Sequence, residues 1–135
     1  MTQIFDDRGI VRPVTVVAAN PDDLTVGDLV AVSGLSKGKG FQGVVKRHGF
    51  HGGPRSHGQK HSEREPGAIG GGGGRAGGRV AKGIRMAGRM GGNRVTVRNL
   101  KIVALDKEAN QILIGGAVPG RRGTKLELNK LKAKS

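Results

Sequence analysis

The sequence predicts a mainly β protein, in which a small β-barrel carries a long basic and glycine-rich extension that lacks regular structure. Short runs of β-branched residues are separated by glycine and proline turns, a pattern typical of small barrels. These runs lie towards both ends of the chain, whereas most of the positive charge lies between them. A length of 135 residues leaves room for one domain. We therefore assign 1–135 to a single domain, with barrel strands within 1–36 and 94–128 and the extension at 37–93.

The first flank and the residues after it contain three predicted strands. Residues 11–17 are rich in valine and alternate between the two faces of a strand. Asn-Pro-Asp-Asp at 20–23 is typical of a turn. Residues 24–33 form the second predicted strand, with an interruption at Gly27, and residues 41–48 form a short third strand that leads into the extension.

The second flank contains the longest strand signal of the chain, at residues 94–106. Residues 111–118 are expected to return as its hairpin partner, and the sequence Pro-Gly-Arg-Arg-Gly at 119–123 turns the chain again. Residues 125–128 close the pattern, and the tail 129–135 is expected to fray. No helix of ordinary length is expected.

The charge of the chain is concentrated in its middle. Residues 37–98 hold fourteen Lys and Arg but only two acidic residues, so they carry +12 of the formal net charge of +14. The same span contains all four histidines and the glycine run 70–74. A segment this cationic and this poor in apolar residues cannot order itself by burial. We therefore expect it to order only against a polyanion, and nucleic acid is the first partner to consider.

An anionic membrane is the second partner that such a charge would suit. Membrane binding would require a basic amphipathic helix, and the glycines spread over 38–58 disfavour any helix there. The sequence also contains no apolar run long enough to span a bilayer and no secretory signal.

The absence of cysteine excludes disulfides and thiolate metal sites. We expect no membrane partner and no cofactor.

Residues 38–43 match the pattern G-x-G-x-x-G. A dinucleotide site would need a helix directly after this motif, but the sequence predicts a strand that then breaks at Gly49. A kinase loop would need further catalytic signatures that the chain lacks. We interpret these glycines as allowing backbone amides to approach phosphates, while Lys37 and Lys39 supply charge.

The histidines and acids of the basic span do not form a predicted metal or catalytic site. His57 and His61 are four residues apart, but no helix is predicted that would bring both rings to one face. We expect the imidazoles to stack on bases or to bind phosphate. Glu63 and Glu65 are expected to pair with neighbouring arginines. No acidic residue lies near both a nucleophile and a base in the sequence, so we expect neither an enzyme nor a small-molecule substrate.

Four motifs occur in a fixed order along nearly the whole chain: SKGKGFQGVVKR at 36–47, PGAIG at 66–70, MAGRMG at 86–91 and GGAVPG at 115–120. Together with residues 1–19, which look like a first hairpin, these motifs resemble the universal large-subunit ribosomal protein L-three family of the bacterial type.

The resemblance implies a β-barrel of the translation-protein type on the surface of the large ribosomal subunit in the cytoplasm. It implies that 37–93 penetrates large-subunit ribosomal RNA towards the peptidyl-transferase region, with its tip near 57–79. It further implies a role in early subunit assembly, contacts with neighbouring ribosomal proteins, and no enzymatic activity, because peptide-bond chemistry belongs to the RNA.

The candidate RNA-binding side chains are the cations and imidazoles of the basic span together with two arginines of the last turn. They are Lys37, Lys39, Lys46, Arg47, His48, Arg55, His57, Lys60, His61, Arg64, Arg75, Arg79, Lys82, Arg85, Arg89, Arg94, Arg121 and Arg122. A second set consists of glycines whose backbone is expected to approach RNA closely. They are Gly38, Gly40, Gly43, Gly70, Gly71, Gly72, Gly73 and Gly74.

The chain also departs from the family pattern. It looks shortened in its N-terminal half, so we expect an incomplete barrel and a dimer if two copies close it. The glutamine that some bacteria modify in this family has no counterpart at 71–74. Two alternatives stay open: a shortened or engineered barrel that folds and self-associates independently of RNA, and an enzyme that uses 38–43 as a phosphate loop.

Overall fold

The structure, a computed structural model, describes residues 1–71 and 77–131. The chain divides into two units. Residues 1–37 and 92–135 form the first, here called the sheet unit, and residues 38–91 form the second, here called the basic unit.

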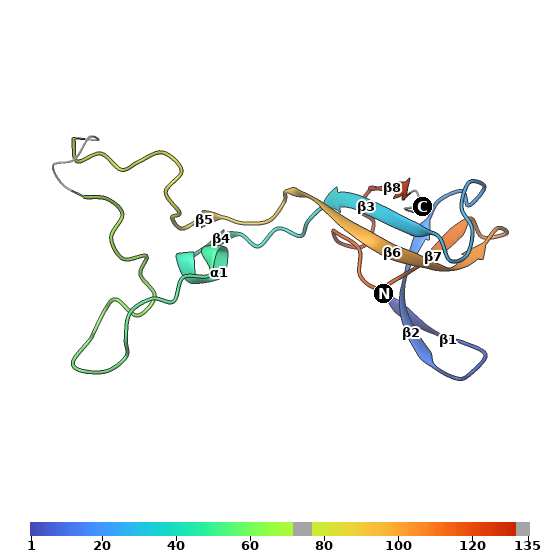
Figure 1. The fold of residues 1–135 in the computed structure, drawn as a ribbon, viewed down its shortest axis with the longest axis horizontal. Helices are drawn as coiled ribbons and strands as arrows, with labels where there is room; N and C mark the ends of the chain where they lie inside the picture. The colour runs from blue at the N-terminus through green and yellow to red at the C-terminus, as the bar shows by residue number, and fades with distance from the viewer. Residues whose placement is uncertain (72–76, 132–135) are drawn as a thin grey trace. The chain divides into compact units, whose positions relative to one another are not determined.

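The sheet unit is built on one antiparallel sheet of six strands (Figure 1). The strands lie in the order β1-β2-β7-β6-β3-β8. Their bounds are Thr2–Phe5 for β1, Val11–Ala18 for β2, Leu29–Leu35 for β3, Arg94–Asp106 for β6, Gln111–Gly115 for β7 and Leu126–Lys130 for β8. The mainly β class is therefore confirmed. Among the described residues β1 and β8 lie at opposite ends of the order without pairing, so no closed barrel is found.

Strand β6 holds the two halves of this sheet together. Its first part pairs with β3, with Arg94 opposite Leu35 at one end and Lys101 opposite Leu29 at the other. Its second part pairs with β7. The register shifts once in each ladder, between Val30 and Val32 and between Ile102 and Ala104. Each shift inserts an extra residue into β6, which is the arrangement of a β-bulge and bends the strand. The bulges let β6 pair with a different neighbour along each half.

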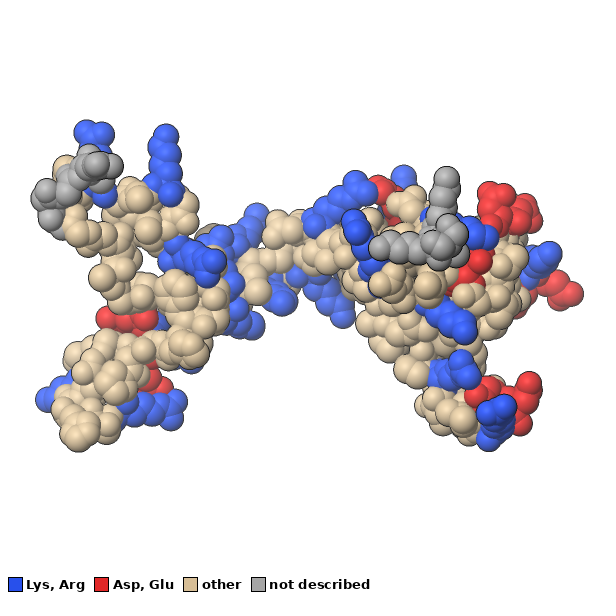
Figure 2. Space-filling view, viewed as in Figure 1, with Lys and Arg blue, Asp and Glu red and all other residues tan. Residues whose placement is uncertain are grey.

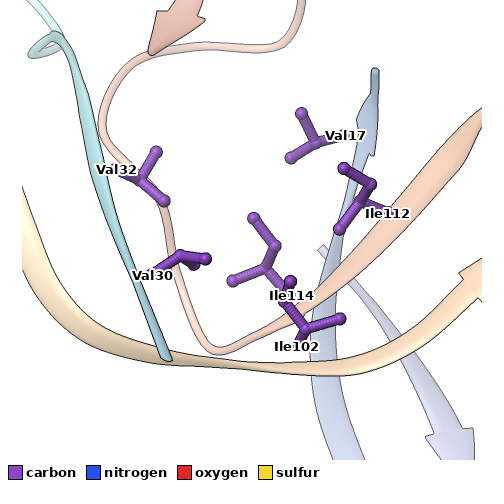
Figure 3. Close-up of a cluster of buried hydrophobic side chains, with 6 residues drawn as sticks. All are labelled: Val17, Val30, Val32, Ile102, Ile112 and Ile114. Atoms are coloured by element: carbon purple, nitrogen blue, oxygen red, sulfur yellow. The ribbon is translucent and has the colours of Figure 1, made fainter. Parts of the chain in front are cut away.

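The core of the sheet unit is a cluster of branched aliphatic side chains. It consists of Val17, Val30, Val32, Ile102, Ile112 and Ile114, and these side chains point towards one another in Figure 3. Val30 and Val32 alternate with neighbours on the opposite face, as do Ile112 and Ile114, because side chains two residues apart lie on one face of a strand. Burial differs between the two faces in β7, whereas β3 is buried at all five positions from Val30 to Gly34.

The predicted strand at 24–33 is wrong over its first five residues. Asp28 accepts a hydrogen bond from the amide of Thr25 at 2.9 Å through its carboxylate, and its own amide donates to the carbonyl of Thr25 at 3.1 Å. Gly27 between them has a φ of 98°, a conformation that glycine adopts without strain. These contacts make residues 24–28 a turn, and β3 begins only at Leu29.

The predicted strand at 41–48 is also wrong in its greater part. Only Phe41–Gln42 forms a strand, β4, which pairs with the equally short β5 at Gly88–Arg89. Val44–His48 is instead the helix α1. Because β5 offers no partner beyond Gln42, the next residues satisfy their backbone groups internally. The expectation that the extension lacks regular structure is corrected by these three short elements.

The tail differs from expectation as well. Asn129 and Lys130 continue β8, and the amide of Leu131 donates to the carbonyl of Leu29 at 2.9 Å. The fraying expected over 129–135 is therefore wrong for its first residues, and 132–135 lie outside the described residues.

Candidate nucleic-acid interface

The basic unit carries a dense positive charge on a segment with almost no core. It contains eleven Lys and Arg against two Glu, a net +9. In Figure 2 the blue cations of this unit project from a thin chain, and red acids are few. Val44 is the only buried apolar side chain among its described residues. Such a surface repels itself and attracts a polyanion.

The outgoing and returning arms of the basic unit, residues 38–48 and 84–91, are joined by backbone hydrogen bonds. The amide of Lys39 donates to the carbonyl of Met90, and the amide of Met90 donates to the carbonyl of Gly40, both at 2.9 Å. The β4–β5 pair continues this ladder. The base of the unit is therefore ordered by its own contacts.

Helix α1 ends at a glycine and is tied to the returning arm by two side chains. Gly49 adopts a left-handed conformation with a φ of 74°, and its amide bonds to Val45. The guanidinium of Arg47 donates to the carbonyl oxygen of Met86 at 2.7 Å, and Nε2 of His48 lies 3.0 Å from the same oxygen. Both side chains are predicted RNA ligands, yet in this structure they contact the protein itself.

A loop in the same unit is closed by a glycine pair. The amide of Gly53 donates to the carbonyls of Ser62 at 3.0 Å and Glu63 at 3.2 Å. A Cβ on Gly52 would overlap the carbonyl oxygen of Glu63, so only glycine permits this approach. Across the loop, Arg55 pairs with the carboxylate of Glu63 at 2.5 Å. Arg55 is therefore a second predicted ligand with a partner inside the protein.

An open cavity of about 610 Å³ lies beside this loop. Its side-chain lining includes His48, Phe50, His51, Ser62, Glu65 and Arg85. The rings of His48 and Phe50 are 6.0 Å apart between centroids and inclined by 42°. Both glutamates were expected to pair with arginines, but only Glu63 does so. Glu65 lines the cavity and makes no ion pair with another described residue.

Most of the predicted cations remain exposed and make no side-chain hydrogen bond or ion pair with another described residue. They are Lys37, Lys39, Lys46, Lys60, Arg64, Arg79, Lys82, Arg85, Arg89, Arg121 and Arg122. The same holds for the imidazoles of His57 and His61. Arg94 differs, because it pairs with Glu127 of β8. Arg75 and Gly72, Gly73 and Gly74 lie outside the described residues.

The predicted backbone-approach glycines stand in open space. A Cβ on Gly38, Gly40, Gly43 or Gly71 would meet no atom within 4 Å, and one on Gly70 would meet only the carbonyl oxygen of Arg79 at 3.9 Å. Of these, only Gly40 has a positive φ, 67°. The packing of the described chain therefore does not explain why these positions are glycine.

The described residues contain no group of three His, Cys, Asp or Glu that could hold a metal ion. Within the same part of the chain, no helix has the length and hydropathy needed to cross a membrane. Phe41 is 83% exposed and so is not part of the core.

Comparison with known proteins gives one consistent family. The model of the family described as Ribosomal protein L3 matches residues 14–117. The chain is 54% identical to the large ribosomal subunit protein uL3 of Herpetosiphon aurantiacus, over 76% of this chain and 48% of that protein. It is 48% identical to the protein of the same name from Chlorobium limicola, over 97% of this chain and 59% of that protein. The chain spans about half the length of the curated relatives it matches.

Proposed function

The chain belongs to the Ribosomal protein L3 family, a family of structural proteins rather than enzymes, and from this premise we propose that it is a structural constituent of the large ribosomal subunit. In this proposal it binds large-subunit ribosomal RNA in the cytoplasmic ribosome and lies beside other large-subunit proteins.

The observation that carries the proposal is the charge of the basic unit. Its net charge of +9 is spread over a chain with one buried apolar side chain among the described residues, and most of its cations have no partner there. Phosphates would neutralise these cations, and arginine binds phosphate in a bidentate manner. The glycines in open space would let the backbone pass close to RNA.

The finer part of the proposal concerns the place of the extension. We infer that 37–93 enters the RNA and returns, that its tip near 57–79 reaches towards the peptidyl-transferase region, and that these contacts support early subunit assembly. The paired arms at the base of the basic unit support an out-and-back path.

The dependence of RNA affinity on salt tests the proposal. For about ten engaged phosphates, the logarithm of the association constant should fall against the logarithm of salt concentration with a slope of about −9 at a duplex-like charge density. The measurement uses the full chain and a fragment of large-subunit ribosomal RNA. Arg79→Ala and Lys82→Ala should each reduce the slope by about 1. A slope near zero would contradict RNA binding by the basic unit.

A second candidate, self-association, is favoured by the open edge of β1. Within the described part of the chain this strand pairs only with β2, carries no charged residue, and ends at Phe5, whose exposed fraction is 65%. An uncharged edge strand can pair with a second copy. Sedimentation equilibrium should then show a dimer that Ile4→Lys abolishes, and a monomer at all concentrations would contradict this candidate.

A further inference from the structure

A carboxylate is an unfavourable group in a site for a polyanion, because it repels phosphate. The basic unit contains two carboxylates, Glu63 and Glu65, which are separated by one residue in the same loop. Glu63 is neutralised by Arg55 at 2.5 Å. Glu65 has no such partner among the described residues and lines the cavity instead. A carboxylate without an ion pair in the described part of so cationic a unit suits a ligand that presents hydrogen-bond donors rather than negative charge.

The walls of the cavity suit a flat aromatic ligand. Phe50 supplies an aromatic ring, and His48 and His51 supply imidazoles. Aromatic and imidazole rings are the groups on which proteins stack unpaired RNA bases. The cavity volume of about 610 Å³ lies in the range of sites for small organic groups. Arg85 at the same cavity could neutralise the phosphate of the nucleotide whose base enters.

The cavity is shaped by contacts of the chain with itself. The left-handed Gly49 ends α1 and lets the amide of Phe50 reach back towards the carbonyl of Val44, at 3.5 Å, so that Phe50 lies near His48. On the other side, the close approach of Gly52 to Glu63 fixes the loop that carries Glu65. The aromatic residues and Glu65 are thus brought together by two glycines in left-handed backbone.

The chemistry of Glu65 selects among the bases. Guanine presents two adjacent donors on its Watson–Crick edge, N1–H and the 2-amino group, and these match the two acceptor oxygens of a carboxylate. Adenine and cytosine each present one amino group beside a ring-nitrogen acceptor, which would face the second carboxylate oxygen without a proton between them. We propose that this cavity binds an unpaired guanine of RNA, with Glu65 accepting from N1–H and the 2-amino group. The inference rests on the proposed RNA-binding function and adds base selectivity to it.

The test uses the full chain and three RNA hairpins that differ only in one bulged nucleotide: guanosine, inosine or adenosine. The stem is the same in all three, so phosphate contacts contribute equally and the bulge reports the base. The guanine bulge should bind about tenfold more tightly than the adenine bulge. Inosine keeps N1–H but lacks the 2-amino group, so its affinity should lie between the other two.

Two matched variants separate base recognition from charge. Glu65→Gln and Glu63→Gln raise the net charge by the same amount, so both should bind the adenine-bulge hairpin somewhat more tightly. Only Glu65→Gln should abolish the preference for guanine. Gly52→Ala, which changes no charge but would push the loop away from Glu63, should also weaken the preference.

Three outcomes would overturn the inference. Equal affinities of the wild-type chain for the three bulges, with the salt slope intact, would leave RNA binding standing and exclude the guanine site. If Glu65→Gln bound all three hairpins more tightly by the same factor, the base preference would be unchanged. This result would show that the cavity lies against phosphate. Loss of the preference in Glu63→Gln as well would assign the effect to charge. Absence of any salt-dependent binding would instead contradict the proposed function itself.

Discussion

The guanidinium of Arg47 donates a hydrogen bond of 2.7 Å to the main-chain carbonyl of Met86. Helix α1 on the outgoing arm is thereby joined to the returning arm by a side chain in addition to the backbone ladder. A Cβ on Gly88 would lie 2.8 Å from the same guanidinium. The arginine thus lies closely against the backbone of the returning arm.

Replacing Arg47 by alanine should loosen the base of the basic unit. Loss of one exposed hydrogen bond from a charged donor costs about 1 kcal/mol. The amide of Met90 should then exchange its hydrogen about fivefold faster in the chain without RNA. Arg79→Ala removes the same charge from an exposed side chain without a described partner. Equal exchange rates in the two variants would show that the Arg47 contact does not order the arms.

The carboxyl group of Asp28 makes the stability of the sheet unit depend on pH. A hydrogen bond from Lys130 at 2.6 Å, and after it one from the amide of Thr25, hold the pKa of Asp28 below its usual value of 3.8. Because the folded pKa is the lower one, the contact stabilises the fold above 3.8, and this contribution is lost as the pH falls through the folded pKa. The thermal midpoint of Asp28→Asn should therefore lie below that of the wild type at neutral pH and approach it in acid. Asp23→Asn, at an exposed position in the preceding turn, should show no such convergence.

Ile102 should be among the positions of the sheet unit most sensitive to truncation. Its side chain is fully buried, and its strand β6 joins the two halves of the sheet. Ile102→Ala should cost about 2–5 kcal/mol in the free energy of unfolding, measured by denaturant titration. Val16→Ala on the neighbouring β2, where the side chain is 43% exposed, should cost about 0.5 kcal/mol or less. Comparable losses would mean that the buried cluster is not the principal core.

In the turn before β8, position 120 should require glycine both for its backbone conformation and for lack of space. Gly120 has a φ of 94°, and a Cβ there would lie 2.9 Å from the carbonyl oxygen of Leu35. Gly123 has a similar φ of 80° but open space around it. Gly123→Ala should therefore cost about 1 kcal/mol from backbone strain alone, and Gly120→Ala should cost about 1–3 kcal/mol. The free energies of unfolding of both variants, measured in urea, separate the cost of backbone strain from the cost of the steric overlap.

Strands with a long local signal could be predicted from the sequence. The predicted strand at 94–106 coincides with β6, because alternation and β-branching act over many residues. The first hairpin, which was expected from the family resemblance, matches β1 and β2. The predicted strand at 41–48 was wrong for a reason that lies outside this segment. Two valines favour a strand locally, but a strand also needs a partner, and β5 is only two residues long.

The basic span could be recognised from composition, but not the contacts of each cation. Arg47, Arg55 and Arg94 look like Arg79 in the sequence, yet the structure pairs the first three with a carbonyl or a carboxylate inside their own unit. The difference between Glu63 and Glu65 likewise depends on how one loop closes. Assignment of the remaining cations to RNA stays a prediction.

The register of β3 against β6 ends at the pair Leu35 and Arg94, so the two strands form a hairpin whose connection is the 58 residues 36–93. Closing so long a loop costs about 2 kcal/mol more in chain entropy than closing a four-residue turn. The ladder between the arms, from the pair Lys39 and Met90 to the pair Gln42 and Gly88, offsets part of this cost by shortening the unpaired length. A partner that held the two arms together would offset more of it, and so would raise the melting temperature of a sheet that it never touches.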